Sequence, residues 1–130
     1  MKFHHAGIAC GDIAAAADFV RRTQPVLSIS PVVADAAQQA ELCMIETAAG
    51  LSIELIAGPV VASYVKKGVY LYHLCWEVPD LLPAIEQLSR EGARLISPPK
   101  PAPLFGGREV AFVYTPLGLM ELLQEERHAL

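Results

Sequence analysis

The stretch His73-Leu74-Cys75-Trp76-Glu77-Val78-Pro79-Asp80-Leu81 decides the fold, because a second version of it lies 68 residues earlier. The earlier copy reads His5-Ala6-Gly7-Ile8-Ala9-Cys10-Gly11-Asp12-Ile13, with seven positions from histidine to aspartate in both. Gly50-Leu51-Ser52-Ile53-Glu54-Leu55 also returns as Gly118-Leu119-Met120-Glu121-Leu122, with the glutamates 67 residues apart. Self-similarity at a nearly fixed offset indicates a duplicated structural unit. Each half of the chain therefore carries one histidine near its start and one glutamate near its end.

Within each half the pattern predicts a strand, a helix and then further strands. The first strands, at 5–10 and 72–78, are short and apolar-rich. They end at Asp12 and Asp80, either of which can cap the helix that follows, predicted over 13–22 and 81–91. Further strands are predicted near 25–33, 40–47, 51–57, 93–97, 109–114 and 119–124. Residues 58–70 and 97–107 are predicted to be loops, and the second, rich in proline, is expected to cover a cavity.

This order of elements predicts the α+β fold class, with two βαβββ modules at about 3–57 and 70–124. We expect the modules to be related by a pseudo-twofold axis and to form one cupped mixed sheet. The chain of 130 residues is predicted to be a single domain over 1–130.

Charge and composition argue against several classes of partner. Ten Lys and Arg residues stand against fourteen Asp and Glu, a net charge of -4, and basic residues adjoin only at Lys66-Lys67 and Arg21-Arg22. This pattern predicts no nucleic-acid partner. Apolar runs are too short to cross a bilayer, and the N-terminus has no secretory signal pattern, so we expect no membrane partner and a cytoplasmic protein. The odd number of cysteines, Cys10, Cys43 and Cys75, predicts free thiols and no structural disulfide.

The repeated histidines and glutamates are candidate metal ligands. Side chains alternate across a strand, so His5, Glu54, His73 and Glu121 should all point away from the faces that pack on helices. Two imidazoles and two carboxylates suit one divalent ion such as Mn²⁺, Co²⁺, Ni²⁺ or Zn²⁺. A lone strand histidine is more often a packing residue, but four such residues at matching offsets favour a metal site. His4, of opposite parity, and His128, in a polar tail, are not expected to be ligands.

In these features the chain resembles the vicinal oxygen chelate superfamily, which has the glyoxalase and bleomycin-resistance fold of paired βαβββ modules. The resemblance covers residues 3–125. In that superfamily the first and last strands of each module supply the ligands, and His5, Glu54, His73 and Glu121 match those positions. Residues 63–68 leading into 72–78, and later 106–112, are most similar to the methylmalonyl-CoA epimerases. The family's His-Pro-Lys segment is replaced by Tyr114-Thr115-Pro116, so the acyl group and the CoA carrier are left open.

The resemblance implies a homodimeric epimerase that removes a proton α to the carbonyl of a small acyl thioester. Glu41 falls where the epimerases carry an acid/base carboxylate and is the expected general base. Glu46 has the opposite parity and would replace Glu41 if the strand register slips by one residue. Glu121 is expected to supply or relay the second proton. Lys66, Lys67, Lys100 and Arg108 are the nearest cationic candidates for a CoA phosphate.

Three other functions remain open. Glyoxalase I, which isomerises a glutathione hemithioacetal, shares the four ligands, but its Phe-Tyr followed by Leu-Gly after the first helix is absent here. A non-catalytic small-molecule binding or resistance protein has the same fold but generally lacks the complete ligand set. Iron dioxygenases of the superfamily use two histidines and one glutamate. A fourth ligand, Glu54, makes that chemistry less favourable because oxygen needs an open face at the metal.

Overall fold

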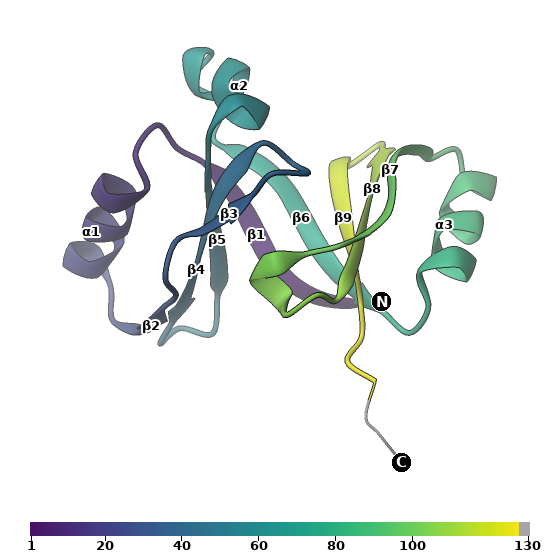
Figure 1. The fold of residues 1–130 in the computed structure, drawn as a ribbon, viewed down its shortest axis with the longest axis horizontal. Helices are drawn as coiled ribbons and strands as arrows, with labels where there is room; N and C mark the ends of the chain where they lie inside the picture. The colour runs from purple at the N-terminus through teal and green to yellow at the C-terminus, as the bar shows by residue number, and fades with distance from the viewer. Residues whose placement is uncertain (128–130) are drawn as a thin grey trace. The chain divides into compact units, whose positions relative to one another are not determined.

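The computed structural model describes residues 1–127, and the order of its elements follows the predicted modules (Figure 1). The first half contains β1 (Lys2–Ala9), α1 (Ile13–Thr23), β2 (Val26–Ile29), β3 (Val33–Asp35), β4 (Ala40–Thr47), β5 (Ser52–Ala57), η1 (Pro59–Val61) and α2 (Ala62–Lys66). The second half contains β6 (Leu71–Val78), α3 (Leu81–Arg90), β7 (Arg94–Pro101), η2 (Pro103–Phe105), β8 (Glu109–Thr115) and β9 (Gly118–Gln124). The predicted α+β class is confirmed. Among residues 1–127, no helix is both long and apolar enough to span a membrane.

The chain forms two compact units, and each is described by itself. The N-terminal unit is His5–Tyr72, and the C-terminal unit consists of Met1–His4 with the residues from His73 onward. The two strands β1 and β6 each pass from one unit into the other. The predicted single domain, its module boundaries and the pseudo-twofold axis stay predictions.

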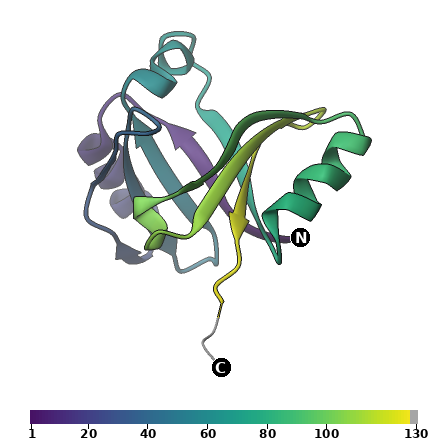
Figure 2. The same ribbon diagram turned by 45° about the vertical axis from the view of Figure 1, so that its right-hand side comes forward.

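In the N-terminal unit, α1 packs on one face of a sheet with the strand order β2-β4-β5-β1 (Figures 1 and 2). The strands β1 and β5 are parallel, whereas β4 is antiparallel to β2, β3 and β5. Asp12 caps α1 as predicted, because its Oδ1 accepts a hydrogen bond from the Ala15 amide at 3.2 Å. The buried core between the helix and the sheet consists of Ile13, Ala17, Val20, Cys43, Ile45 and Leu55.

In the C-terminal unit, α3 packs on one face of a sheet with the order β6-β9-β8-β7. The buried core on that face consists of Val78, Leu81, Ile85, Ala111, Val113, Met120 and Leu122. A second cluster covers the opposite face and contains Cys75, Ala102, Val110, Phe112 and Leu123, with Phe105 of η2 packed against it. The segment that contains η2 therefore covers apolar side chains on the sheet face that points away from α3.

The start of α3 differs from the prediction. Asp80 is the residue before the helix but makes no capping hydrogen bond with its side chain. Its Oδ1 accepts instead from Arg127 at 3.0 Å. The Leu81 amide donates to Gln124 Oε1 at 3.3 Å, so a side chain 43 residues away satisfies the first turn.

Three segments also depart from their predicted structure. The strand expected at 25–33 is divided into β2 and β3, with Pro31, which has no amide proton, between them. The loop at 58–70 contains the two short helices η1 and α2. The strand β7 continues to Pro101 through the predicted loop, because it pairs with β8 alone and prolines are tolerated on the unpaired side of an edge strand. Its register shifts between Leu95 and Ser97 and again before Lys100.

Candidate functional site

The N-terminal unit brings His5 and Glu54 together. Gly7 lies opposite Glu54 in the parallel ladder of β1 and β5, and His5 comes two residues earlier on the same face of β1. His5 Nε2 is 3.6 Å from Glu54 Oε1, and the two residues are 0% and 2% exposed. Since glycine has no side chain at the position opposite Glu54, the space beside this carboxylate is left to the imidazole.

The C-terminal unit contains a second pair of the same kind. Cys75 lies opposite Glu121 in the parallel ladder of β6 and β9, and His73 comes two residues earlier. His73 Nε2 is 3.1 Å from Glu121 Oε1, and each residue is 2% exposed. Phe112 faces Glu121 from β8 and sets its ring nearly perpendicular to the His73 imidazole, at 5.6 Å between centroids. The sequence analysis assigned no role to Phe112, although the pairing of β8 with β9 places it opposite Glu121.

Both pairs lie on the sheet faces that point away from the helices. In the N-terminal unit Ile53 and Leu55, the neighbours of Glu54 on β5, pack with α1. In the C-terminal unit Met120 and Leu122, the neighbours of Glu121 on β9, pack with α3. The alternation predicted from the sequence therefore holds in each unit.

The geometry and chemistry of each pair fit a divalent metal. Two ligands that each lie about 2.0–2.2 Å from one ion, at tetrahedral or octahedral angles, are about 2.8–3.6 Å apart. The measured 3.1 Å and 3.6 Å fall within that range. Imidazole nitrogen and carboxylate oxygen are ligands for the transition metals and zinc. A buried carboxylate is also stabilised by a cation, because burial otherwise penalises its charged form.

The strand register places Glu41 and Glu46 on opposite faces of the N-terminal sheet. Glu41 lies opposite Ala57 in the β4–β5 ladder and shares the parity of Cys43 and Ile45, which pack with α1. It therefore points to the face opposite Glu54. Glu46 lies on the same face as Glu54, because Met44 pairs with Glu54 and Glu46 follows Met44 by two residues. The number of residues in the turn between β4 and β5 sets this register, and it is the sequence signal that could have distinguished Glu46 from Glu41.

Of the cationic candidates, Arg108 already forms hydrogen bonds within the fold. Arg108 donates to Glu77 Oε2 at 2.6 Å and to the Gln124 backbone oxygen at 2.9 Å, so the fold uses its guanidinium. Lys66 ends α2, and Lys100 lies opposite Val110 on β7. His4 sets its ring edge against Phe105, and His128 lies outside the described residues.

The three cysteines Cys10, Cys43 and Cys75 are not joined in disulfide bonds, as predicted. Burial raises the pKa of the Cys10 thiol above its ordinary value, and the negative charge of Asp12 raises this pKa further. A thiol of this kind is a weak nucleophile at neutral pH.

Known proteins share this architecture. A family model described as the Glyoxalase/Bleomycin resistance protein/Dioxygenase superfamily matches residues 4–112. The crystal structure of methylmalonyl-CoA epimerase from Mycobacterium tuberculosis aligns with a TM-score of 0.82 and 19% identity, covering 97% of this chain and 89% of that one. A hypothetical protein from Bacillus halodurans C-125 aligns with a TM-score of 0.79 and 21% identity, covering 99% and 97%.

A superfamily member from Vibrio splendidus 12B01 aligns less closely, with a TM-score of 0.54 and 16% identity over 95% of this chain and 100% of that one. No curated protein matches the chain significantly. At these identities the solved structures show a common fold and confirm the predicted fold class.

Proposed function

Because the chain belongs to the glyoxalase/bleomycin resistance protein/dioxygenase superfamily, we propose that its two His/Glu pairs together bind one divalent metal ion and that the protein is a metal-dependent epimerase. The observation that carries this proposal is the duplicated contact: His5 with Glu54 and His73 with Glu121, each pair buried and 3.6 Å or 3.1 Å apart. Co²⁺, Mn²⁺, Ni²⁺ and Zn²⁺ are the candidate ions.

The proposed substrate is a small acyl thioester similar to methylmalonyl-CoA. Support comes from the sequence resemblance and from the fold shared with a solved structure named as methylmalonyl-CoA epimerase. Apolar side chains surround the second pair, since Val110, Phe112 and Leu123 lie on the same face of the C-terminal sheet as Glu121. An apolar lining suits an acyl chain and excludes water from a developing charge.

Each residue has a defined part in the proposed reaction. The imidazole Nε2 atoms of His5 and His73 and the carboxylates of Glu54 and Glu121 would hold the ion. When bound, the ion supplies positive charge that stabilises the oxygen onto which negative charge moves as the α-proton leaves. Glu121 is the candidate for returning a proton to the opposite face of the carbon. A homodimer is proposed from the resemblance, and light scattering that shows a monomer would contradict the dimer. A cytoplasmic location is proposed from the odd number of cysteines, which suits a reducing compartment.

Proton NMR of methylmalonyl-CoA in D₂O tests the proposal. The α-proton signal is followed with protein that has been stripped of metal and then reloaded with Co²⁺ or Mn²⁺. We expect exchange of the α-proton only with the reloaded protein. A fully loaded protein that leaves the signal intact would contradict the methylmalonyl assignment. The glutathione hemithioacetal is then the next substrate to test, and failure to bind metal at all would favour a non-catalytic binding protein.

A further inference from the structure

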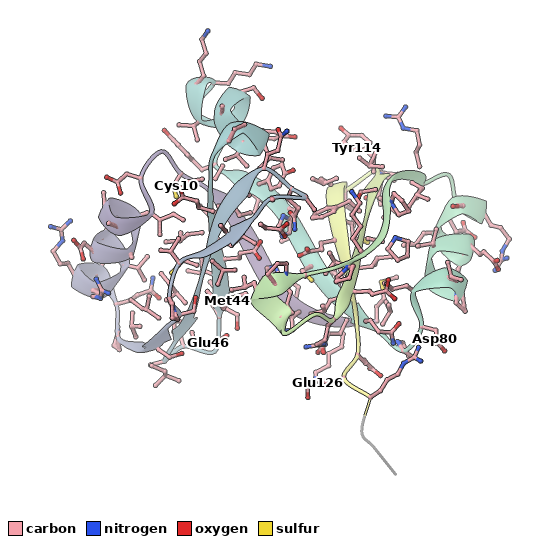
Figure 3. All side chains as sticks on the ribbon, in the orientation of Figure 1. Cys10, Met44, Glu46, Asp80, Tyr114 and Glu126 are labelled. Atoms are coloured by element: carbon pink, nitrogen blue, oxygen red, sulfur yellow. The ribbon has the colours of Figure 1, made fainter. Side chains whose placement is uncertain are left out.

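Glu46 and Ser52 form a hydrogen-bonded pair on the same sheet face as Glu54. They are direct partners in the antiparallel ladder of β4 and β5 (Figure 3 labels Glu46). Ser52 Oγ donates a hydrogen bond to Glu46 Oε2. The parallel register of β1 and β5 pairs Ala6 with Ile53, so His5 is the next residue in line beside Ser52. One row of the N-terminal sheet thus reads Glu46, Ser52, His5.

The adjacent row contains the carboxylate of the proposed metal pair. It consists of Met44, Glu54 and Gly7, so Glu46 is the diagonal neighbour of Glu54. Diagonal positions in an antiparallel pair are about 7–8 Å apart, within reach of long side chains. Glu46 is partly exposed, whereas Glu54 is buried. The Glu46 carboxylate is therefore in the row next to Glu54 and partly open to solvent, and its hydrogen-bond partner is the Ser52 hydroxyl.

The duplication shows that the fold does not require this pair of residues. In the C-terminal unit the corresponding ladder pairs Phe112 with Glu121 and Tyr114 with Leu119. Tyr114 therefore takes the position of Glu46, and Leu119 takes the position of Ser52. The histidine and glutamate ligands are repeated in both units, but the acid and its hydroxyl partner occur in one. Tyr114 and Leu119 occupy the corresponding strand positions in the C-terminal unit. The fold therefore does not require a carboxylate at position 46, which is consistent with a functional role for Glu46.

We propose that Glu46 is the acid/base residue of the reaction and that Ser52 is its positioning residue. This inference rests on the proposed function. In the forward step the α C–H bond breaks, its proton passes to a carboxylate oxygen of Glu46, and its electron pair moves into the enolate. In the reverse step Glu46 returns a proton to the same face of the carbon. The Ser52 hydroxyl holds Oε2 and leaves Oε1 to take the proton.

Three variants test the inference: Glu46→Gln, Ser52→Ala and, as the matched control, Glu41→Gln. The control removes a carboxylate from the same strand but from the face that packs on α1. Each protein is assayed for Co²⁺ bound per chain after dialysis, by elemental analysis without substrate. Each is then assayed for loss of the α-proton of methylmalonyl-CoA in D₂O.

We expect all three variants to bind Co²⁺ as the unsubstituted protein does. Exchange should fall by about 100-fold or more in Glu46→Gln, which is the usual contribution of a general base. Ser52→Ala should lower kcat by about 10-fold with KM unchanged, the loss typical of residues that orient a functional group. Glu41→Gln should exchange at the unsubstituted rate.

The inference is overturned if Glu46→Gln exchanges the α-proton at a rate within about threefold of the unsubstituted protein. It is also overturned if this variant loses Co²⁺, since Glu46 would then act through the metal. Loss of exchange in Glu41→Gln with retention in Glu46→Gln would restore Glu41 as the base. If the unsubstituted, fully loaded protein shows no exchange, the proposed function itself fails and the role of Glu46 fails with it. These outcomes are distinct because the unsubstituted protein is measured first.

Discussion

The guanidinium of Arg108 lies 2.6 Å from the carboxylate of Glu77, and the two side chains are only 19% and 17% exposed. Arg108 also donates to the backbone oxygen of Gln124, so it links β6 to the end of β9. Such a pair differs from a surface ion pair because removal of one partner leaves a partly buried charge.

Arg108→Ala is expected to lower the free energy of unfolding by about 2 kcal/mol, since hydrogen bonds to a charged, partly buried group are lost. Urea unfolding followed by circular dichroism measures the change. Arg21→Ala is the control, because the pair of Arg21 and Asp18 is 53% and 60% exposed. The control should change stability by about 0.5 kcal/mol or less. Equal losses in both variants would contradict this account of Arg108.

Metal stoichiometry distinguishes one shared ion from two separate ions. We expect one Co²⁺ per chain and expect either Glu54→Gln or Glu121→Gln alone to abolish tight binding, because each removes an anionic ligand from the proposed single centre. Elemental analysis after dialysis measures the ratio. Two ions per chain, with each substitution removing one, would show that the His5/Glu54 and His73/Glu121 pairs act independently.

The adjacent histidines should behave differently. His5→Ala removes a proposed ligand and is expected to weaken Co²⁺ binding by about 100-fold or more. The control His4→Ala removes a ring that packs against Phe105 and should leave the metal content unchanged. Competition with a chelator of known affinity gives both dissociation constants. Loss of metal in His4→Ala with retention in His5→Ala would reverse the assignment.

The Cys10 thiol should titrate at unusually high pH. Burial, followed by the charge of Asp12, raises its pKa. The raised pKa stabilises the fold at pH values below the ordinary thiol pKa, and this contribution is lost as the pH rises through the raised value. The rate of alkylation by iodoacetamide against pH, read by mass spectrometry, should show a midpoint above that of a free thiol. Asp12→Asn keeps a capping oxygen and should lower the midpoint; an unchanged midpoint would exclude the charge as a cause.

Gly58→Ala should be more damaging than Gly50→Ala. Gly58 has φ 112° and ψ -173°, a region that is essentially limited to glycine. A Cβ there would also lie 3.0 Å from the Gln39 backbone oxygen, whereas at Gly50 nothing lies within 4 Å. We expect Gly50→Ala to cost about 1–2 kcal/mol for its positive φ and Gly58→Ala to cost more. Urea unfolding of both variants is the measurement, and equal costs would exclude the contact with Gln39.

The duplicated motif allowed us to predict the order of elements along the chain and the sheet faces of the four His and Glu side chains, because alternation along a strand leaves few choices. Once Ile53 and Leu55 are assigned to the core, Glu54 must point the other way. The face of Glu41 was harder to predict, because it depends on how β4 pairs with β5 across the turn. A resemblance aligns residues along the chain but does not fix that register.

Other differences between the predicted and the observed structure have similar causes. The side chain of Gln124 satisfies the start of α3 from 43 residues away, so no local pattern around Asp80 indicates it. The proline content of residues 97–107 predicts a loop when the strand is assumed to be central. Only the sheet order shows that β7 is paired on one side.

The prolines of β7 also affect how copies of the protein meet in a crowded solution. An unpaired strand edge is a template onto which another extended chain can add, and such addition leads to open-ended aggregates. Pro98, Pro99 and Pro101 carry no amide proton, and because amides alternate between the two sides of a strand, an incoming strand would find fewer donors along this part of β7. The first part of the segment that we expected to be a loop, residues 97–101, is an edge strand whose prolines oppose polymerisation.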